Sequence, residues 1–292
     1  MKGVIAKHRK VTYFSLIGLL ALSLILAGII FYSSRQDLKV IFLDVGQGDA
    51  ILISRGFNQI LIDGGPSGQA LLEKLGKYVS FWDRKIEIVI ATHPDADHIG
   101  GLIDLARTYQ IGEIIDTQTE SESQLYKKYR EMIAEKKTGE TKGVAGVNIK
   151  IGDSAEMKII SPAENYNSQE KDTNLNSIVS RLVFGQNSFL FTGDLPSDGE
   201  QALVKSGENI SSQVLKVGHH GSKYSSSAEF LKAVSPRDAI ISVGANNRYG
   251  HPAPEILERL RNIGINIMRT DESGDIIYEC QSSTSRCQII YN

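Results

Sequence analysis

Two histidines and two aspartates fall within six positions of the segment ATHPDADHIGG, residues 91–101. Imidazole and carboxylate groups are ligands that Zn²⁺ and Mn²⁺ accept in proteins. In an extended turn, the alternate positions His93, Asp95 and Asp97 point to one side, with His98 beside them. The alternative is a charged surface turn in which Asp97 caps a helix, but a cap needs one carboxylate and no histidine. The spacing therefore predicts a metal site.

The flanking residues predict that this segment connects a strand to a helix. Residues 86–91 (IEIVIA) form an apolar run typical of a buried strand, and residues 99–109 (IGGLIDLARTY) begin an amphipathic helix. Residues 93–98 are therefore expected to form a loop. Open α/β sheets build their sites in loops at the carboxyl ends of strands, so this position agrees with a functional role.

Three further loops that follow predicted strands also carry histidine or aspartate. They hold Asp194 after strand 188–192, His219 and His220 after strand 214–217, and His251 after strand 239–243. Five of the six histidines in the chain thus lie in strand-end loops. Packing alone does not account for that concentration, so these loops are expected to supply one site.

The remaining sequence predicts short strands first, followed by alternating helices and strands. Further strands are predicted at 38–43, 50–53, 59–62, 157–160 and 178–184, and helices at 71–79, 124–137, 196–205, 228–234 and 254–262. The helix at 124–137 is polar and is expected to be solvent-exposed. Loops and tail are predicted as a loose loop at 138–146, a disordered linker or active-site loop at 164–173, and β-hairpin material at 265–290.

The first 34 residues predict a membrane segment. Residues 1–10 carry four basic residues and no acidic one, and residues 11–32 contain only three clearly polar residues. About 20 apolar residues span a bilayer as a helix, and basic residues on the amino side keep that end in the cytoplasm. We expect a cytoplasmic leader (1–10), a transmembrane signal-anchor (11–32), a linker (33–37) and one exported domain (38–292). A cleaved signal peptide is the alternative, and the domain is then secreted.

Cysteine usage and charge describe the exported part. Cys280 and Cys287 flank a polar turn between two short β-prone runs. A disulfide across a hairpin is expected there in an oxidising compartment, with two free thiols as the alternative. Beyond residue 34 the chain has 28 basic against 34 acidic residues, a net charge of −6. Strong nucleic-acid binders show a basic footprint, and the charge of this chain does not indicate one.

The order of these clusters resembles the metallo-β-lactamase superfamily. More narrowly, six motifs resemble the hydrolase domain of ComEC-type competence proteins: LDVGQGDAILI, LIDGG, THPDADHIGG, LVFGQNSFLFTGDL, VGHHGSKYSS and NRYGHP. The resemblance runs from about Lys39 to the C-terminus. ComEC proteins also carry a multi-span channel and an OB-like domain, so this chain resembles a stand-alone, membrane-anchored version.

The resemblance implies an α/β fold, an αββα sandwich of two sheets with helices outside and metal at one edge. It implies hydrolysis by a metal-activated water, with one or two divalent ions. The ligands follow by position. His93 and Asp95 serve a first ion, Asp97, His98 and either His219 or His220 serve a second, and Asp194 bridges them.

Two departures from the superfamily pattern affect the choice of metal. Asp95 stands where the superfamily usually has histidine. The middle histidine is also missing, since residues 173–179 read TNLNSIV, with Asn174, Asn176 and Ser177. An oxygen-rich first site makes Mn²⁺ a rival to Zn²⁺.

Several polar residues near these loops have two interpretations. The candidates for catalysis are Asp97, His251 and Lys223. His251 is a general acid or oxyanion donor, or else a structural cap before Pro252. Lys223, with Ser222, holds a phosphate oxygen or is a solvated lysine. Turn structure is the expected role of Asp44, Gln47, Asp49 and Asp63, and a hydrogen bond to a metal ligand is a second interpretation of Asp63.

The resemblance and the mixed ligand set favour an extracytoplasmic metal-dependent phosphodiesterase, a nuclease that acts on DNA. One alternative is a phosphodiesterase or phosphorylcholine esterase that acts on wall polymers. Another is a non-catalytic DNA-binding module of an uptake machine, which the missing middle histidine suggests. β-Lactam hydrolysis is not expected, because fold does not fix substrate.

Overall fold

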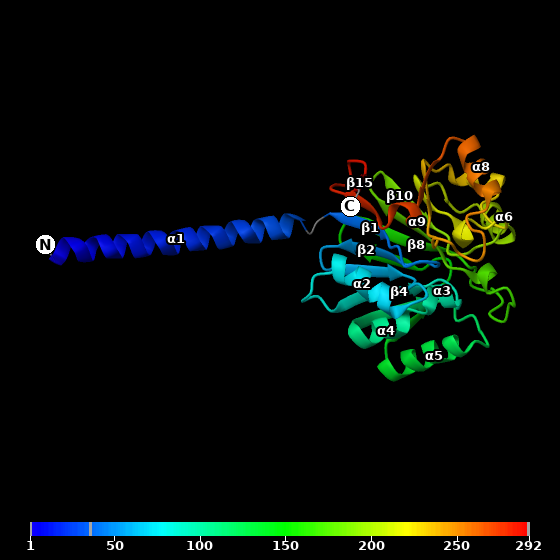
Figure 1. Cartoon of the computed structure of the whole chain (residues 1–292), viewed down its shortest axis with the longest axis horizontal. Coiled ribbons are helices and arrows are strands. Elements are labelled where there is room, and N and C mark those ends of the chain that lie inside the picture. Colours follow the sequence, from blue (N-terminus) through cyan, green and yellow to red (C-terminus); the bar gives the residue numbers. More distant parts are fainter. Residues whose placement is uncertain (1, 35–36, 291–292) are drawn as a thin grey trace.

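The computed structural model describes residues 2–34 and 37–290. A long helix, α1 (Lys2–Ser34), extends from one end of a two-sheet domain (Figure 1). Residues 35 and 36, which belong to the linker expected at 33–37, lie outside the described residues. Within α1, Thr12–Ile29 is long and apolar enough to cross a membrane, with a mean hydropathy of 2.1, although signal sequences share these properties.

Two mixed sheets pack face to face in the domain. The first has the order β15 (Gln288–Ile290), β14 (Ile276–Cys280), β1 (Leu38–Phe42), β2 (Ile51–Arg55), β3 (Asn58–Ile62), β4 (Lys85–Ala91), β5 (Gln110–Asp116) and β6 (Gly139–Lys142). The second has the order β13 (Asn266–Arg269), β12 (Asp238–Ile241), β11 (Val214–Lys216), β10 (Asn187–Phe191), β9 (Val179–Phe184), β8 (Ala155–Ser161) and β7 (Asn148–Ile151).

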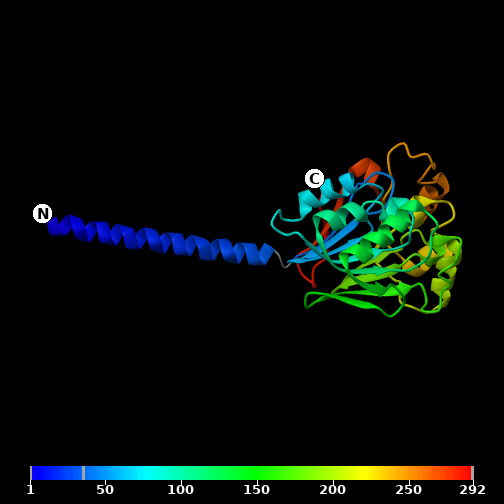
Figure 2. The same cartoon turned by 90° about the horizontal axis from the view of Figure 1, so that it is seen from below.

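Helices cover the outer face of each sheet (Figure 2). The first sheet is covered by α2 (Gly68–Tyr78), α4 (Leu102–Thr108) and α5 (Gln124–Lys136), and the second by α6 (Ser197–Lys205), α7 (Ala228–Val234) and α8 (Pro254–Asn262). Alternation along β1 shows why the chain folds this way. Val40 and Phe42 pack between the sheets, whereas Ile41 packs against the helices, because successive strand residues face opposite sides. The expected αββα sandwich is confirmed.

The motif segment departs from the expected loop. Its second half is helical, as α3 (Ala96–Ile99), followed by α4 after a break at Gly100 and Gly101. Amide-to-carbonyl bonds from Ile99 to Asp95 (3.0 Å) and from Gly100 to Ala96 (3.1 Å) close this turn. Alternation of residues 93, 95 and 97 along an extended chain was therefore the wrong geometry, since residues 97 and 98 project from a helical turn.

Four other expectations need correction. Residues 110–116 form β5, a strand between β4 and β6 that was not predicted, and the loose loop at 138–146 contains β6. Helix α5 is not simply exposed, because Tyr129, Met132 and Ile133 are buried against the sheet. The tail at 265–290 is not one hairpin: β13 pairs with β12 in the second sheet, and a short helix, α9 (Thr270–Ser273), precedes β14 in the first. Within it, the expected Cys280–Cys287 disulfide is present.

The segment at 164–173 contacts the domain instead of forming a free linker. The Tyr166 ring lies 4.5 Å from the Nζ atom of Lys142, and the Asn167 carbonyl accepts a bond of 2.7 Å from Asn176 Nδ2. It leads into a 3₁₀ helix, η1 (Thr173–Asn176), whose first hydroxyl reaches the motif segment.

Candidate metal centre

The carboxyl ends of strands from both sheets meet at one edge of the sandwich. The motif segment follows β4, Asp194 follows β10, and the two adjacent histidines follow β11, which runs parallel to β10. Four side chains at this edge are almost completely buried: His93, His98, Asp194 and His220. The sheet thus brings together residues that are far apart in the sequence, as the strand-end loops predicted.

Short distances connect the buried side chains. Nε2 of His220 lies 3.2 Å from Asp97 Oδ2 and 3.4 Å from Asp194 Oδ2, and Nε2 of His98 lies 3.4 Å from the same Asp194 oxygen. Several triads place one possible ligand atom per residue within 4.8 Å of the others: His93, His98 and Asp194; Asp97, His98 and His220; Asp49, Asp194 and His220; and Asp49, Asp63 and His98. These are distances at which a cation can be shared.

The Nδ1 atom of each buried histidine is held by an acceptor. His98 Nδ1 donates to Asp63 Oδ2 (2.8 Å), and His220 Nδ1 donates to the carbonyl of Ser242 (2.9 Å). The Thr92 hydroxyl gives its proton to Asp63 (2.7 Å), so it must accept from His93 Nδ1 (3.0 Å). In neutral imidazole, a protonated Nδ1 leaves Nε2 as an acceptor, which is the arrangement that metal-ligating histidines show.

The opposite ring nitrogens have no hydrogen-bond partner. Among the described residues, buried atoms without one include Nε2 of His93, His98 and His220 and Oδ1 of Asp194. A buried polar atom left unpaired costs free energy. These open nitrogens and the Asp194 carboxylate lie in overlapping groups of possible ligands, so the residues present fit a divalent cation.

Charge in this cluster favours a cation as well. Burial would lower the pKa of His98, but the carboxylates of Asp194 and Asp63 outweigh it and raise that pKa well above its ordinary value. The same balance, with Asp194 and Asp49 as the anions, raises the pKa of His220 to about 10. Burial would raise the pKa of Asp194, but the neighbouring histidines hold it well below its usual range. Protons and a metal ion therefore compete for the same nitrogens.

The adjacent histidines differ in position. Both residues have left-handed backbone angles, φ 49° at His219 and φ 53° at His220, inside the turn η2 (Gly218–Gly221). This turn sends His220 into the cluster, whereas the His219 side chain is 30% exposed, with Nε2 3.9 Å from Asp194 Oδ2. Of the pair, only His220 belongs to a triad among the described residues.

Asp95 lies on the open side of the cluster. Its side chain is 45% exposed, and its Oδ2 atom is 4.0 Å from His93 Nε2. The Thr173 hydroxyl donates to its other oxygen at 2.7 Å. Ser177, in the segment that lacks the superfamily histidine, accepts a bond of 3.2 Å from the Asp194 amide. Hydroxyl groups thus occupy the side where the sequence departs from the superfamily pattern.

A buried ion pair of lysine and aspartate lies next to His220. Lys216, on β11, pairs with Asp49 at 2.5 Å, and Asp49 Oδ1 lies 3.4 Å from His220 Nδ1. Asp49 was expected only as a turn residue, and Lys216 was not considered. The signal in the sequence was a lone lysine within the apolar run VLKV, where a charge requires a buried partner. Asp63 does hold a candidate ligand, as was expected.

Two glycines allow backbone segments to touch behind the cluster. A Cβ atom at Gly48 (φ +135°) would lie 2.2 Å from the carbonyl oxygen of Asp97, and one at Gly101 would lie 2.1 Å from that of Gly64. Hydrogen bonds cross the same contacts, from the Asp49 amide to the Asp97 carbonyl (3.2 Å) and from the Gly64 amide to the His98 carbonyl (2.7 Å). The glycines thereby fix the position of α3 against the β1–β2 turn and against the segment that follows β3.

The two remaining catalytic candidates lie outside the buried cluster. His251 is partly buried, its ring centroid is 5.6 Å from that of His219, and its Nδ1 atom has no hydrogen-bond partner. Burial and the neighbouring histidines lower the pKa of His251. Lys223 is exposed, with its Nζ atom 5.1 Å from the centre of the Tyr224 ring. His251 therefore sits at the rim, and Lys223 contacts an exposed aromatic ring.

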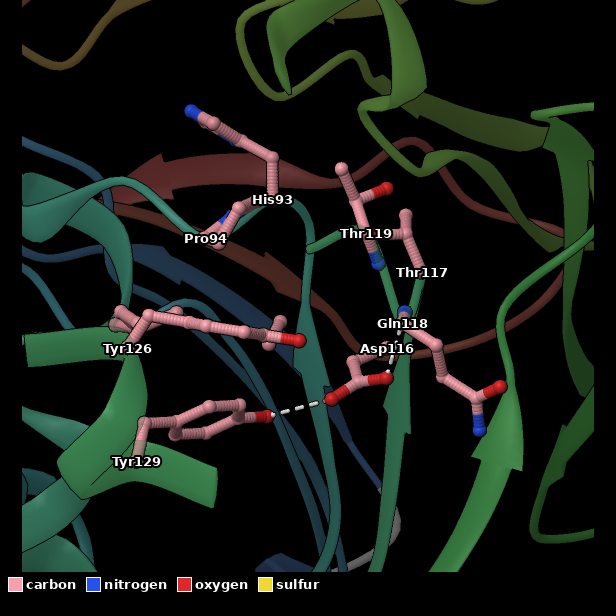
Figure 3. Close-up of a pocket in the computed structure, with 10 residues that line it drawn as sticks. His93, Pro94, Asp116, Thr117, Gln118, Thr119, Tyr126 and Tyr129 are labelled. Carbon is pink, nitrogen blue, oxygen red and sulfur yellow. Dashed lines mark hydrogen bonds between the residues drawn. The ribbon is translucent and has the colours of Figure 1, made fainter. Parts of the chain in front are cut away.

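A small cavity lies behind His93 (Figure 3). Its lining includes Asp116, Tyr126 and Tyr129, from β5 and α5, and the His93 ring points away from Asp116 and Tyr129. Its volume of about 10 Å³ holds at most one water molecule. Asp116 accepts bonds from Tyr129 Oη (3.1 Å) and from the Gln118 amide (2.9 Å). This cavity lies in the packing between the end of β5 and α5, and it is too small for a substrate.

Comparisons with known proteins agree with the geometry. The sequence profile of the Metallo-beta-lactamase superfamily matches residues 43–158. ComE operon protein 3 of Bacillus subtilis is 32% identical over 262 residues, which cover 82% of this chain and 33% of that protein. Competence protein ComA of Neisseria gonorrhoeae is 33% identical over 256 residues (86% and 34%), and Recombination protein 2 of Haemophilus influenzae is 32% identical over 246 residues (83% and 29%).

The chain spans about a third of the length of these relatives. Among solved structures, the metallo-beta-lactamase fold protein YhfI from Bacillus subtilis aligns with a TM-score of 0.58 at 12% identity, over 84% of this chain and all of that one. That likeness shows the fold alone. The matched profile, the curated relatives and the buried His/Asp cluster together show that the chain is a metallo-beta-lactamase superfamily protein related to ComE operon protein 3, ComA and Recombination protein 2.

Proposed function

We propose that this protein is a membrane-anchored, extracytoplasmic metal-dependent phosphodiesterase whose substrate is DNA. The observation that carries the proposal is that three buried histidines of overlapping His/Asp groups leave Nε2 unpaired while the protein holds Nδ1 of each. A structural histidine cluster would use both ring nitrogens in internal bonds. One nitrogen fixed and the other left open is the arrangement of a ligand.

The ligands that we assign are His93, Asp97, His98, Asp194 and His220. Asp95 is the candidate that completes the set on its open side, at the side chain held by Thr173. Carboxylate oxygens make up about half of these donors, which keeps both Zn²⁺ and Mn²⁺ as candidates, with one or two ions. A divalent ion held there supplies Lewis-acid polarisation of a phosphoryl oxygen and lowers the pKa of a bound water.

The side chains at the rim act on the substrate. His219 and His251 face each other there, and both are within the loops that follow β11 and β12. With its pKa lowered, His251 is neutral near pH 7, so it can donate or accept a proton at a phosphate oxygen or leaving group. Lys223 is exposed and follows the adjacent histidines in the same loop. It is the candidate contact to the phosphate backbone of a longer substrate.

DNA is favoured over other phosphodiesters by the relatives. One of them is named for competence and another for recombination, processes in which DNA is handled. The net charge of −6 beyond residue 34 predicts weak non-specific binding, which suits an enzyme that releases its product. Helix α1 and the disulfide support a domain outside the cytoplasm.

The adjacent histidines provide a matched pair of variants to test the proposal. Purified full-length protein is loaded with Mn²⁺ or Zn²⁺, its metal content is measured, and cleavage of single- and double-stranded DNA is followed. We expect His220→Ala to lose metal and activity together, and His219→Ala to keep the metal while it loses activity. Metal retained by His220→Ala would contradict the ligand set. Wild-type protein that binds metal and cleaves wall polymers but not DNA would contradict DNA as the substrate and identify wall polymers in its place.

A further inference from the structure

Exposed aromatic side chains gather at the end of the domain that lies opposite the metal centre. Phe81 and Trp82, in the loop between α2 and β4, are 78% and 56% exposed, and Phe57, in the β2–β3 turn, is 55% exposed. The rings of Phe81 and Trp82 form an edge-to-face pair with centroids 4.7 Å apart. Large apolar groups exposed together indicate an interaction surface. We call these three residues the aromatic end.

Strand register places these two loops side by side. Antiparallel pairing of Leu38 with Arg55 puts the β2–β3 turn beside the first residue of β1. Because β3 and β4 run parallel, the start of β4 lies at that same end. A hydrogen bond of 3.0 Å from Gln59 Nε2 to Asp83 Oδ2 connects the two loops directly. Both views show the α2–β4 loop at the end of the domain nearest α1 (Figures 1 and 2).

The apolar helix arrives at this end of the domain. Its candidate membrane span ends at Ile29, and β1 begins at Leu38. The ring of Phe31, on the last turns of α1, lies 6.3 Å from the ring of Phe57 in an edge arrangement. A short connection leaves the domain little distance from the bilayer surface, since each residue spans at most about 3.5 Å.

We propose that the aromatic end docks on the outer surface of the bilayer that α1 spans, with Phe57, Phe81 and Trp82 in its interfacial layer. This inference rests on the anchor in the proposed function. Tryptophan prefers the membrane–water interface, where its apolar ring can be buried while its N–H group stays hydrated. Phenylalanine side chains of interfacial segments bury their rings at the boundary between headgroups and acyl chains. The continuity of the aromatic end with α1 through the Phe31–Phe57 contact selects lipid as the occupant of this surface.

Docking in this way sets the direction of the metal centre. The motif segment begins at the far end of β4, seven residues from the aromatic end, which is about 20 Å at 3.3 Å per residue. The centre is thereby held on the side of the domain that faces away from the lipid. A domain that tumbled freely on its linker would have no such preference.

Trp82 is the only tryptophan in the chain, so its fluorescence reports on this surface alone. Full-length protein is reconstituted in phosphatidylcholine–phosphatidylglycerol vesicles, and flotation verifies its association with lipid. We expect the Trp82 emission to lie at shorter wavelength than that of the Phe57→Ser, Phe81→Ser double variant in the same vesicles. We also expect stronger quenching by lipid that carries a nitroxide near the headgroup than by lipid that carries it at the chain end.

Paired variants separate docking from anchoring. We expect the double variant Phe57→Ser, Phe81→Ser to float with vesicles but to lose the nitroxide quenching of Trp82. Tyr224→Ser removes another exposed aromatic ring, in the loop that follows the adjacent histidines, and is expected to leave the quenching unchanged. Wild-type protein that floats with an unquenched, unshifted Trp82 would overturn the docking surface and leave the anchor intact. Protein that does not float would overturn both.

Discussion

Replacement of Asp63 by asparagine should weaken metal binding although Asp63 is not assigned as a ligand. Its carboxylate accepts from the Thr92 amide (2.8 Å), the Thr92 hydroxyl (2.7 Å) and His98 Nδ1 (2.8 Å). Asparagine keeps the size and one acceptor, which the Thr92 amide can retain. Its NH₂ group then faces His98 Nδ1, and two donors oppose each other. The imidazole can relieve this by moving its proton to Nε2, the atom that the cluster needs as a lone pair.

The expected magnitude follows from this change of tautomer. Loss of such an outer partner typically lowers metal affinity by about 10- to 100-fold, which corresponds to about 1.4–2.7 kcal/mol. The loss should depend on His98. In a His98→Ala background the same replacement should add little, because the histidine through which Asp63 acts is gone.

Calorimetric titration of metal-free protein with Zn²⁺ and Mn²⁺ at one fixed pH measures the effect. The matched control is Asp153→Asn, at an exposed aspartate in the turn between β7 and β8, which should bind metal like the wild type. Thermal unfolding of the metal-free variants checks that the fold persists. An Asp63→Asn variant with a dissociation constant within about twofold of the wild type would refute the tautomer argument.

Three further predictions concern stability. Lys216→Met leaves the Asp49 carboxylate buried without its partner and should lower the free energy of unfolding by about 3–5 kcal/mol; an unchanged urea midpoint would contradict this. Asp275→Asn should lower the free energy of unfolding by about 1–3 kcal/mol at pH 7. Burial would raise the pKa of the Asp275 carboxyl, but hydrogen bonds from Lys74 and Tyr78 outweigh burial and lower that pKa. A carboxyl whose pKa is lowered by folding stabilises the protein above its unfolded pKa of about 3.9, and this stabilisation is lost as the pH falls through the lowered folded-state pKa. The urea midpoints of the variant and wild type should therefore approach each other as the pH is lowered below about 3.9. Chelation of the metal should lower Tm, since ligand at 100 times Kd stabilises by about 2.7 kcal/mol; a scan in EDTA that matches the metal-loaded scan would argue against a resident ion.

Strand-end chemistry was predictable from the sequence, because parallel strands bring their carboxyl ends to one edge whatever the loops between them do. That rule predicts that His98, Asp194 and one of the pair His219 and His220 lie together. It could not choose between His219 and His220, which differ only through the left-handed turn that orients them. Nor could it exclude a helical turn at Asp97, since helix and extended loop differ there by backbone geometry that no side-chain pattern marks.

The unpredicted strands were missed for different physical reasons. Strand β5 begins at Gln110, two residues after α4 ends at Thr108, and no glycine or proline separates the two patterns. Strand β6 (GETK) lies at the edge of its sheet and has no apolar alternation to detect. The Lys216–Asp49 pair was missed because each charge alone predicts exposure, and only the tertiary fold brings the two together.

The glycine contacts behind the cluster bear on how such a protein can diverge. A ligand exchange, such as aspartate for histidine at position 95, alters affinity or metal choice and leaves the backbone where it was. Any side chain at Gly48 or Gly101 would have to displace the carbonyl oxygen of Asp97 or of Gly64, and with it the helical turn that presents the ligands. Evolution can therefore retune the chemistry of this centre in small steps, while its backbone junctions are inherited nearly intact or lost altogether.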